Sequence, residues 1–161
     1  MPLPRRLPRT YADPVFTVTE SVDIDRPAAD VFAFLTDGAN RPRWDSTVVS
    51  ETLTSPAPVQ VGTTLRTRMR ALGREVAFDW RVTEHVAGRR MAVESTSGII
   101  ATSSVLTFAD RMPAGTRVTV HIEASPSGIM RLAEPMIAES VRTTLGTSLA
   151  RAKRLLEDET G

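Results

Sequence analysis

Apolar and polar residues alternate along FTVTESVDID, residues 16–25. The apolar residues occupy every second position except one, where Glu20 stands. A period of two predicts a strand with one buried face. Because Glu20 falls on the buried side, its carboxylate needs a partner or a raised pKa there, or a bulge turns it outward. We predict no catalytic residue from the sequence, and Glu20 comes nearest to a candidate.

A helical period follows this strand. Asp25 is expected to cap a helix whose apolar residues recur at helical spacing over residues 28–35. Gly38 is expected to end that helix as a left-handed C-cap. Residues 40–45 predict one more short helical turn, which carries Trp44 among charged neighbours. An indole in this setting either stacks on a ligand or closes a core built by distant residues.

Residues 47–124 predict six strands joined as hairpins, because alternating runs are separated by breaks that contain Gly or Pro. A tight turn at ALGR places Leu65 opposite Trp80 on an apolar face. The same register places Arg66 opposite Asp79 on the other face, which is a favourable cross-strand charge pair. The pattern therefore predicts a meander that is polar outside and apolar inside.

The register extends outward from this hairpin. Val82 is expected to face Val93, and Val93 is expected to face Leu106. Ser95 and Ser104 would then meet across neighbouring strands on the apolar face. Their hydroxyls can either fix a carbonyl of a ligand or bond to each other and to water.

The chain offers few groups for catalysis. Its two histidines, His85 and His121, fall on the solvent side of their strands, and Glu84 is left open between the two faces. The sequence contains no nucleophile elbow, no glycine-rich phosphate loop and no carboxylate–histidine cluster with metal-ligand spacing. We therefore predict no cofactor and no metal site.

An apolar stripe at helical spacing runs from Ala133 to Leu156 and predicts one long final helix. Pro135 either kinks this helix or belongs to its first turn. The expected fold class is α+β: one curved, seven-stranded antiparallel sheet wrapped around the long C-terminal helix, with two short helices between the first two strands. A single curved sheet that grips the helix buries both apolar faces.

Composition limits the possible partners. Residues 1–13 are rich in Pro and Arg and predict an unstructured basic tail, followed by a single domain at 14–158. The net charge of +1 provides no field that recruits nucleic acid or a membrane surface. The chain has no cysteine and no apolar run of membrane-spanning length. These properties predict a cytoplasmic protein without a nucleic-acid partner or a membrane span.

Five motifs stand in a specific order: SVDIDRPAADVFAFLTDGANRPRWD, VGTTL, WRVTEHVAGRRM, TFADRMPAGTRVTV and LARAKRLLE. In this order the chain resembles the START-like superfamily, in particular its polyketide cyclase/dehydrase and lipid-transport group. The resemblance covers roughly residues 15–157 and implies the helix-grip fold. It also implies that Trp44 packs inward at one end of the grip, where it helps to close the mouth of a cavity.

We predict that the protein carries or sequesters a small hydrophobic ligand, such as a lipid or a polyketide-like molecule, between the sheet and the final helix. Pockets of this kind combine apolar walls with a few polar groups. The predicted ligand-binding residues are Trp44, Leu65, Thr67, Met69, Phe78, Trp80, Val93, Ser95, Ser104, Leu106, Phe108, Val120, Met136 and Ser140.

Two alternatives stay open. One is a cofactor-free polyketide cyclase, aromatase or dehydrase, since enzymes of this superfamily use polar residues inside the cavity to orient a chain and aid its dehydration. Glu20 or the serines would then orient the substrate. The other is an interaction module with a filled cavity, which would act through the outward arginines Arg66, Arg68 and Arg70. The sequence leaves the oligomeric state open between monomer and homodimer.

Overall fold

The computed structural model describes residues 16–71 and 73–158, and the predicted tail at 1–13 lies outside them. The strands are β1 (Phe16–Ile24), β2 (Val48–Leu53), β3 (Thr64–Ala71), β4 (Arg74–Val86), β5 (Arg90–Ser97), β6 (Ala101–Arg111) and β7 (Gly115–Ser125). The helical segments are α1 (Ala28–Thr36), η1 (Gly38–Asn40), α2 (Arg41–Trp44), η2 (Gly128–Ala133) and α3 (Glu134–Asp158). This element order agrees with the predicted one.

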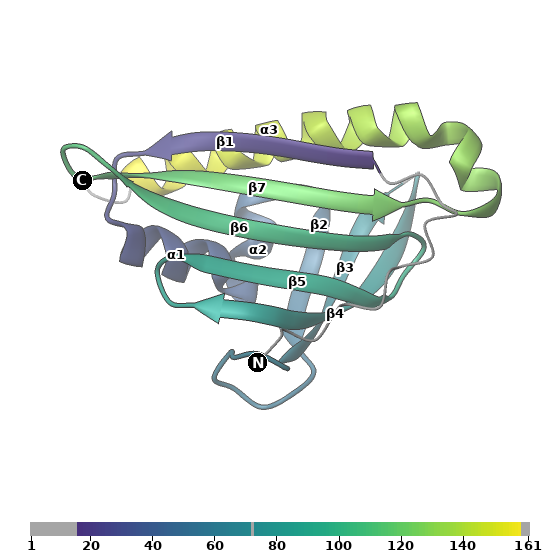
Figure 1. The fold of residues 1–161 in the computed structure, drawn as a ribbon, viewed down its shortest axis with the longest axis horizontal. Helices are drawn as coiled ribbons and strands as arrows, with labels where there is room; N and C mark the ends of the chain where they lie inside the picture. Colours follow the sequence, from purple (N-terminus) through teal and green to yellow (C-terminus); the bar gives the residue numbers. More distant parts are fainter. Residues whose placement is uncertain (1–15, 72, 159–161) are drawn as a thin grey trace, which may run out of the picture.

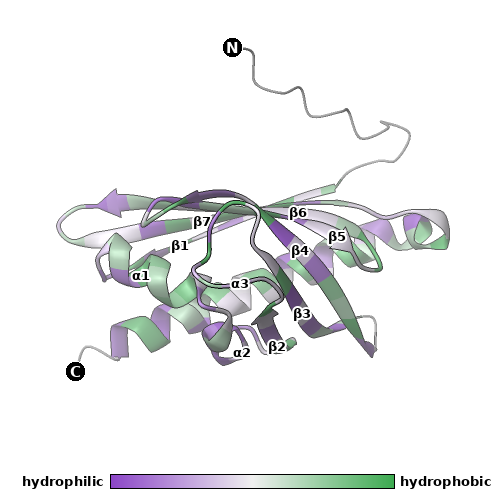
Figure 2. Ribbon diagram, turned by 90° about the horizontal axis from the view of Figure 1, so that it is seen from below, coloured by the Kyte–Doolittle hydropathy of each residue, from purple (hydrophilic) through white to green (hydrophobic). Residues whose placement is uncertain are grey.

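The seven strands form one antiparallel sheet in the order β1-β7-β6-β5-β4-β3-β2 (Figure 1). The sheet curls, and Figure 2 shows α1, α2 and α3 together on its concave side. The long helix α3 runs beside β1 at one edge of the sheet. The predicted helix-grip architecture is therefore confirmed.

The β3–β4 hairpin has the predicted register. Leu65 pairs with Trp80 and Arg66 pairs with Asp79, so Arg66 and Trp80 lie on opposite faces. On the convex face the Arg66 guanidinium donates two hydrogen bonds to the Asp79 carboxylate, at 2.8 and 3.1 Å. These bonds hold the pKa of Asp79 at about 2, with a further hydrogen bond from Ser97. The apolar pattern and the charge pair together fix this register.

A β-bulge in β4 reverses the predicted side of the sheet on which the following residues lie. Val82 pairs with Val93 as predicted, but the next paired residue of β4 is Glu84, so Thr83 is the extra residue. Glu84 consequently lies on the convex face, where its carboxylate accepts a 2.6 Å hydrogen bond from Arg90. His85, expected on the solvent side, turns inward instead. Its ring meets the ring of Phe32 edge to face, at 5.5 Å between centroids.

The β5–β6 pairing differs from the prediction by two residues. Val93 faces Ser104 rather than Leu106, and Met91 faces Leu106. A slip of two residues leaves every side chain on its expected face, so the hydrophobic pattern cannot reveal it. Ser95 therefore does not meet Ser104, and the predicted serine pair is wrong.

The ends of α1 also differ from the prediction. Pro27 rather than Asp25 occupies the N-cap position, and Asp37 is the C-cap. Gly38 belongs to η1 and does not adopt a left-handed conformation. Glycine is required there for another reason, because a Cβ at Gly38 would lie 2.8 Å from the backbone oxygen of Glu51.

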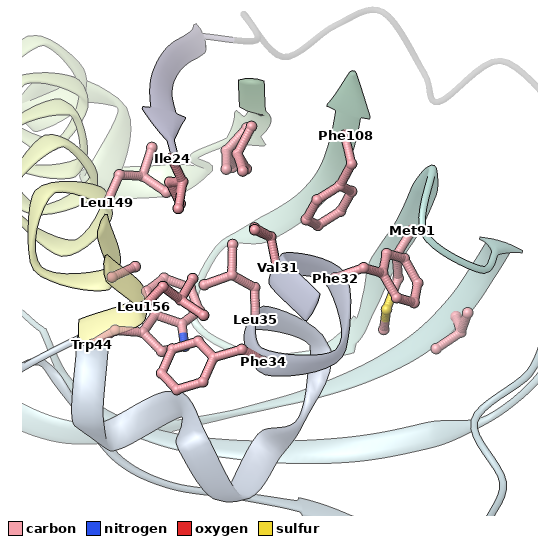
Figure 3. Packing of buried hydrophobic residues seen from close by; sticks show 14 of the residues in the cluster. Ile24, Val31, Phe32, Phe34, Leu35, Trp44, Met91, Phe108, Leu149 and Leu156 are labelled. Atoms are coloured by element: carbon pink, nitrogen blue, oxygen red, sulfur yellow. The ribbon is translucent and has the colours of Figure 1, made fainter. Parts of the chain in front are cut away.

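The start of the long helix α3 agrees with the position of its proline. Pro135 lies in the first turn of α3, so it marks the start of the helix rather than a kink. Further along, Leu149, Ala152 and Leu156 are buried in the main hydrophobic core, together with residues of α1 and α2 (Figure 3). Lys153 Nζ donates to the Asp23 carbonyl at 2.6 Å, which ties the last part of α3 to the end of β1.

Replacing Gly38 by alanine tests the close approach of η1 to β2. Because the added methyl group meets backbone rather than a flexible side chain, we expect Gly38→Ala to lower the free energy of unfolding by about 1–3 kcal/mol. Gly146→Ala is the control, since nothing lies within 4 Å of its added Cβ. Alanine in the middle of α3 should raise the free energy of unfolding by about 0.5–1 kcal/mol. Urea denaturation measures both, and a neutral Gly38→Ala variant would contradict the packing argument.

Candidate functional site

A cavity of about 780 Å³ lies between the concave face of the sheet and α3. This volume falls within the range of small-molecule pockets. The sheet, α2 and the first half of α3 all contribute side chains to its wall. Of the residues predicted to bind ligand, those that line the cavity are Trp44, Leu65, Thr67, Met69, Phe78, Trp80, Val93, Ser104, Leu106, Val120 and Ser140.

Three residues of the predicted set do not line the cavity. Ser95 pairs with Trp80, and its hydroxyl accepts a 2.9 Å hydrogen bond from the Thr102 amide. Phe108 is buried in the core, where its ring meets that of Phe32 at 5.1 Å. Met136 is 77% exposed, because the neighbouring Ile137 is the residue that α3 turns inward.

Glu20 also lies outside the cavity wall. It pairs with Val120 and therefore belongs to the concave side of β1, as its parity predicted. Glu20 is partly exposed. The lining of the cavity does not include it. The nearest candidate for a catalytic residue in the sequence thus has no place in the site.

The sequence interpretation missed a carboxylate that does line the cavity. Glu51 shares an inward face with Thr67, its partner on β3. The Glu51 carboxylate accepts a 2.8 Å hydrogen bond from the Thr67 hydroxyl, which in turn accepts one of 3.1 Å from Trp80 Nε1. A register shift between Val48 and Ser50 gives Glu51 this orientation. Strict alternation along β2 would place Glu51 on the convex face, so the sequence pattern alone could not reveal its inward position.

Arg41 connects Glu51 to a second carboxylate. Its guanidinium donates to Asp45 at 3.2 Å and to Glu51 at 3.5 Å. Asp45 is buried and also accepts hydrogen bonds from the amide and the hydroxyl of Thr47. All four residues line the cavity, and the group carries two carboxylates against one guanidinium. The i,i+4 spacing of Arg41 and Asp45 in RPRWD is the signal that could have indicated this pair.

Trp44 belongs both to the core and to the cavity wall. It is 3% exposed and lies beside Phe34, Leu35 and Leu156 in the core (Figure 3). The Arg41 guanidinium covers its ring, at 4.7 Å from the centroid. Among the described residues, neither Trp44 Nε1 nor Arg41 Nε has a hydrogen-bond partner, although both atoms are buried.

Three charged residues of the cavity lining, Arg70, Arg74 and Glu75, lie at the β3–β4 hairpin and are exposed. Trp44, which the family resemblance implies at the mouth, is buried among core residues of α1 and α3. In the described segments 16–71 and 73–158, no cluster of three or more metal-ligating side chains occurs. No helix in these segments is both long and apolar enough to span a bilayer.

Comparison with known proteins agrees with this architecture. Residues 15–157 match the family described as polyketide cyclase / dehydrase and lipid transport, and the chain therefore belongs to that family. No curated protein sequence matches the chain.

Solved structures share the fold. A protein from Thermus thermophilus is 16% identical with a TM-score of 0.78, covering 91% of this chain and 100% of its own. A START superfamily protein from Mycobacterium smegmatis is 14% identical with a TM-score of 0.76, covering 88% and 97%. The Zhui aromatase/cyclase from a Streptomyces species is 13% identical with a TM-score of 0.71, covering 88% and 96%. At these identities the likeness is one of fold.

Thr67 offers a test of the polar part of the wall. Thr67→Val removes the hydroxyl between Trp80 and Glu51 and leaves both partners without that hydrogen bond. Because Thr67 is 2% exposed, we expect the free energy of unfolding to fall by about 1–3 kcal/mol. Thr67→Ser keeps the hydroxyl and should lose clearly less. If both variants unfold at the same urea concentration, the network does not stabilise the fold.

Proposed function

From its membership of the polyketide cyclase/dehydrase and lipid-transport family, we propose that this protein binds a small hydrophobic ligand in the cavity between the sheet and α3, and carries or sequesters it. The open cavity of about 780 Å³ is the observation that carries the proposal. Most of its lining is apolar, and burial of apolar surface drives the binding of such ligands.

The chemistry of the wall supports a ligand with an apolar body. Leu106, Val120 and Ile122 from the sheet face Val141 and Leu145 from α3. Charged lining residues are confined to the solvent-exposed hairpin and to the group around Arg41. An elongated or ring-shaped molecule therefore meets apolar side chains on both sides along most of its length.

The alternative of an interaction module with a filled cavity has less support. Two of the outward arginines that would form its surface are already paired, Arg66 with Asp79 and Arg68 with Glu75. Exposed ion pairs of this kind are typical of a solvated sheet face. The open volume also speaks against a filled interior.

Filling the cavity tests the proposal. Ser104 lines the cavity, whereas its neighbour Ser103 pairs with Glu94 and Glu123 on the convex face. We expect Ser104→Trp to weaken the binding of the neutral dye Nile red at least about tenfold, a loss of ~1.4 kcal/mol. Ser103→Trp should leave binding unchanged. Dye fluorescence measures binding, and circular dichroism shows that both variants are folded. Equal binding by the two variants would place the dye elsewhere.

A second candidate function is the dehydration or cyclisation of a polyketide-like chain, and Glu51 is the observation that favours it. A carboxylate in the wall of an apolar cavity can take a proton from the carbon beside a carbonyl. The Zhui aromatase/cyclase has the same fold. In a dehydration, Glu51 would remove that proton, a C=C bond would form, and the β-hydroxyl would leave as water with a proton from solvent.

A phenyl-substituted β-hydroxyketone tests this candidate, because its elimination product absorbs in the near ultraviolet. If Glu51 is the base, Glu51→Gln should slow the reaction at least about 100-fold. Glu20→Gln is the matched control and should react at the wild-type rate, since Glu20 lies outside the cavity. A wild-type rate no faster than that of buffer alone would argue for carriage.

A further inference from the structure

We propose that Gly98 is a specificity-determining residue: it lets the ring of Phe78 lie back against the β5–β6 turn, which leaves the cavity wide enough for a planar, fused-ring ligand. This inference rests on the proposed ligand-binding function and deepens it, because it names a class of ligand and the residue that selects it. It concerns the part of the wall that β4 and the β5–β6 turn form.

The backbone of the β5–β6 turn packs closely on the Phe78 ring. A Cβ at Gly98 would lie 2.4 Å from Cδ1 and 2.8 Å from Cε1 of that ring, much closer than an ordinary van der Waals contact. Gly98 also has a φ of 148°, a conformation that glycine adopts far more readily than other residues. Phe78 is buried and lines the cavity. Its ring therefore has the turn on one side and the cavity beside it.

Hydrogen bonds on both sides of the glycine hold the turn in place. Before it, the Ser97 hydroxyl donates to the Asp79 carboxylate at 2.7 Å. After it, the Thr102 hydroxyl donates to the Ile100 carbonyl at 2.9 Å. A side chain in place of the glycine would consequently displace the Phe78 ring rather than the turn. The open volume that can receive the displaced ring is the cavity itself.

The same part of the wall suits a planar ligand. Phe78 and Trp80 both line the cavity, and their rings are nearly parallel, at 22° with 5.4 Å between centroids. The indole is fixed by its hydrogen bond to Thr67. Ile99 and Ile100 of the turn add apolar lining beside these rings. A rigid fused-ring system loses less conformational freedom on binding to such a wall than an alkyl chain does.

Phenanthrene, which has three fused rings, and 1-dodecanol, a single chain, provide the test. Crowding by a methyl group costs enough binding energy that Gly98→Ala should weaken phenanthrene binding at least about tenfold. A narrow chain passes beside the displaced ring, so its affinity should change less than about twofold. Gly88→Ala is the matched control, because Gly88 also has a positive φ but nothing lies within 4 Å of its added Cβ. Equilibrium dialysis measures both affinities.

Removing the Phe78 ring provides a second measurement. In the Gly98→Ala background, Phe78→Leu takes away the atoms that the new methyl group meets, so the double variant should bind phenanthrene about as tightly as Phe78→Leu alone. Such coupling is expected only of residues in contact. If Gly98→Ala fails to fold, Phe78→Leu still tests the inference by itself. It should widen the cavity and shift the preference from phenanthrene towards the larger, four-ring pyrene.

The outcomes separate this inference from the proposed function. If wild type binds 1-dodecanol but not phenanthrene, the ligand-binding function stands and the proposed ligand class is wrong. If Gly98→Ala weakens both ligands equally or neither, or if Phe78→Leu neither restores phenanthrene binding nor favours pyrene, Gly98 does not select the ligand. If wild type binds neither of these ligands nor Nile red, the proposed function itself fails.

Discussion

The structure depends on a difference in width, because one long helix covers only part of the concave face of a wide, curled sheet. Among the strands, α3 packs chiefly against β1, at the sheet edge, while the sheet curls away from it through β6, β5 and β4. Apolar side chains on those distant strands, such as Phe78 and Leu106, consequently face the cavity rather than the helix. An amphipathic sheet normally buries its apolar face against another layer. Here the missing part of that layer is the space in which we propose that the ligand lies.

The short helices limit that space at its inner end. Trp44 packs against core residues of α1 and α3 and also lines the cavity. Its position depends on the tight contact between η1 and β2, which Gly38 permits because a larger residue would meet the backbone of Glu51. The same contact brings Glu51 near Arg41. The packing of the fold and the polar part of the site therefore share residues, so mutations here change stability and binding together.

The sequence predicted strand register and the buried face correctly wherever apolar and polar residues alternate without interruption along a strand. In β3 and the first half of β4, alternation and the Arg66–Asp79 pair predicted the register, and the cavity wall from Leu65 to Trp80 followed from it. The rule failed at bulges, because one extra residue reverses the face of everything after it. The bulge in β4 turned His85 inward, and the shift in β2 did the same for Glu51. Neither irregularity has a local signal such as glycine or proline.

The family description spans cyclases, dehydrases and lipid transport, and the two kinds of function place different demands on the same cavity. Carriage requires apolar surface and a fixed polar anchor, whereas dehydration also requires a base within reach of a carbon-bound proton. Whether Glu51 can act as that base decides between carriage and dehydration. Its carboxylate already accepts hydrogen bonds from Thr67 and Arg41, so a base at this position would have to reach a carbon-bound proton from within these contacts. Carriage makes no such demand, because the same contacts then only shape the polar part of the cavity wall.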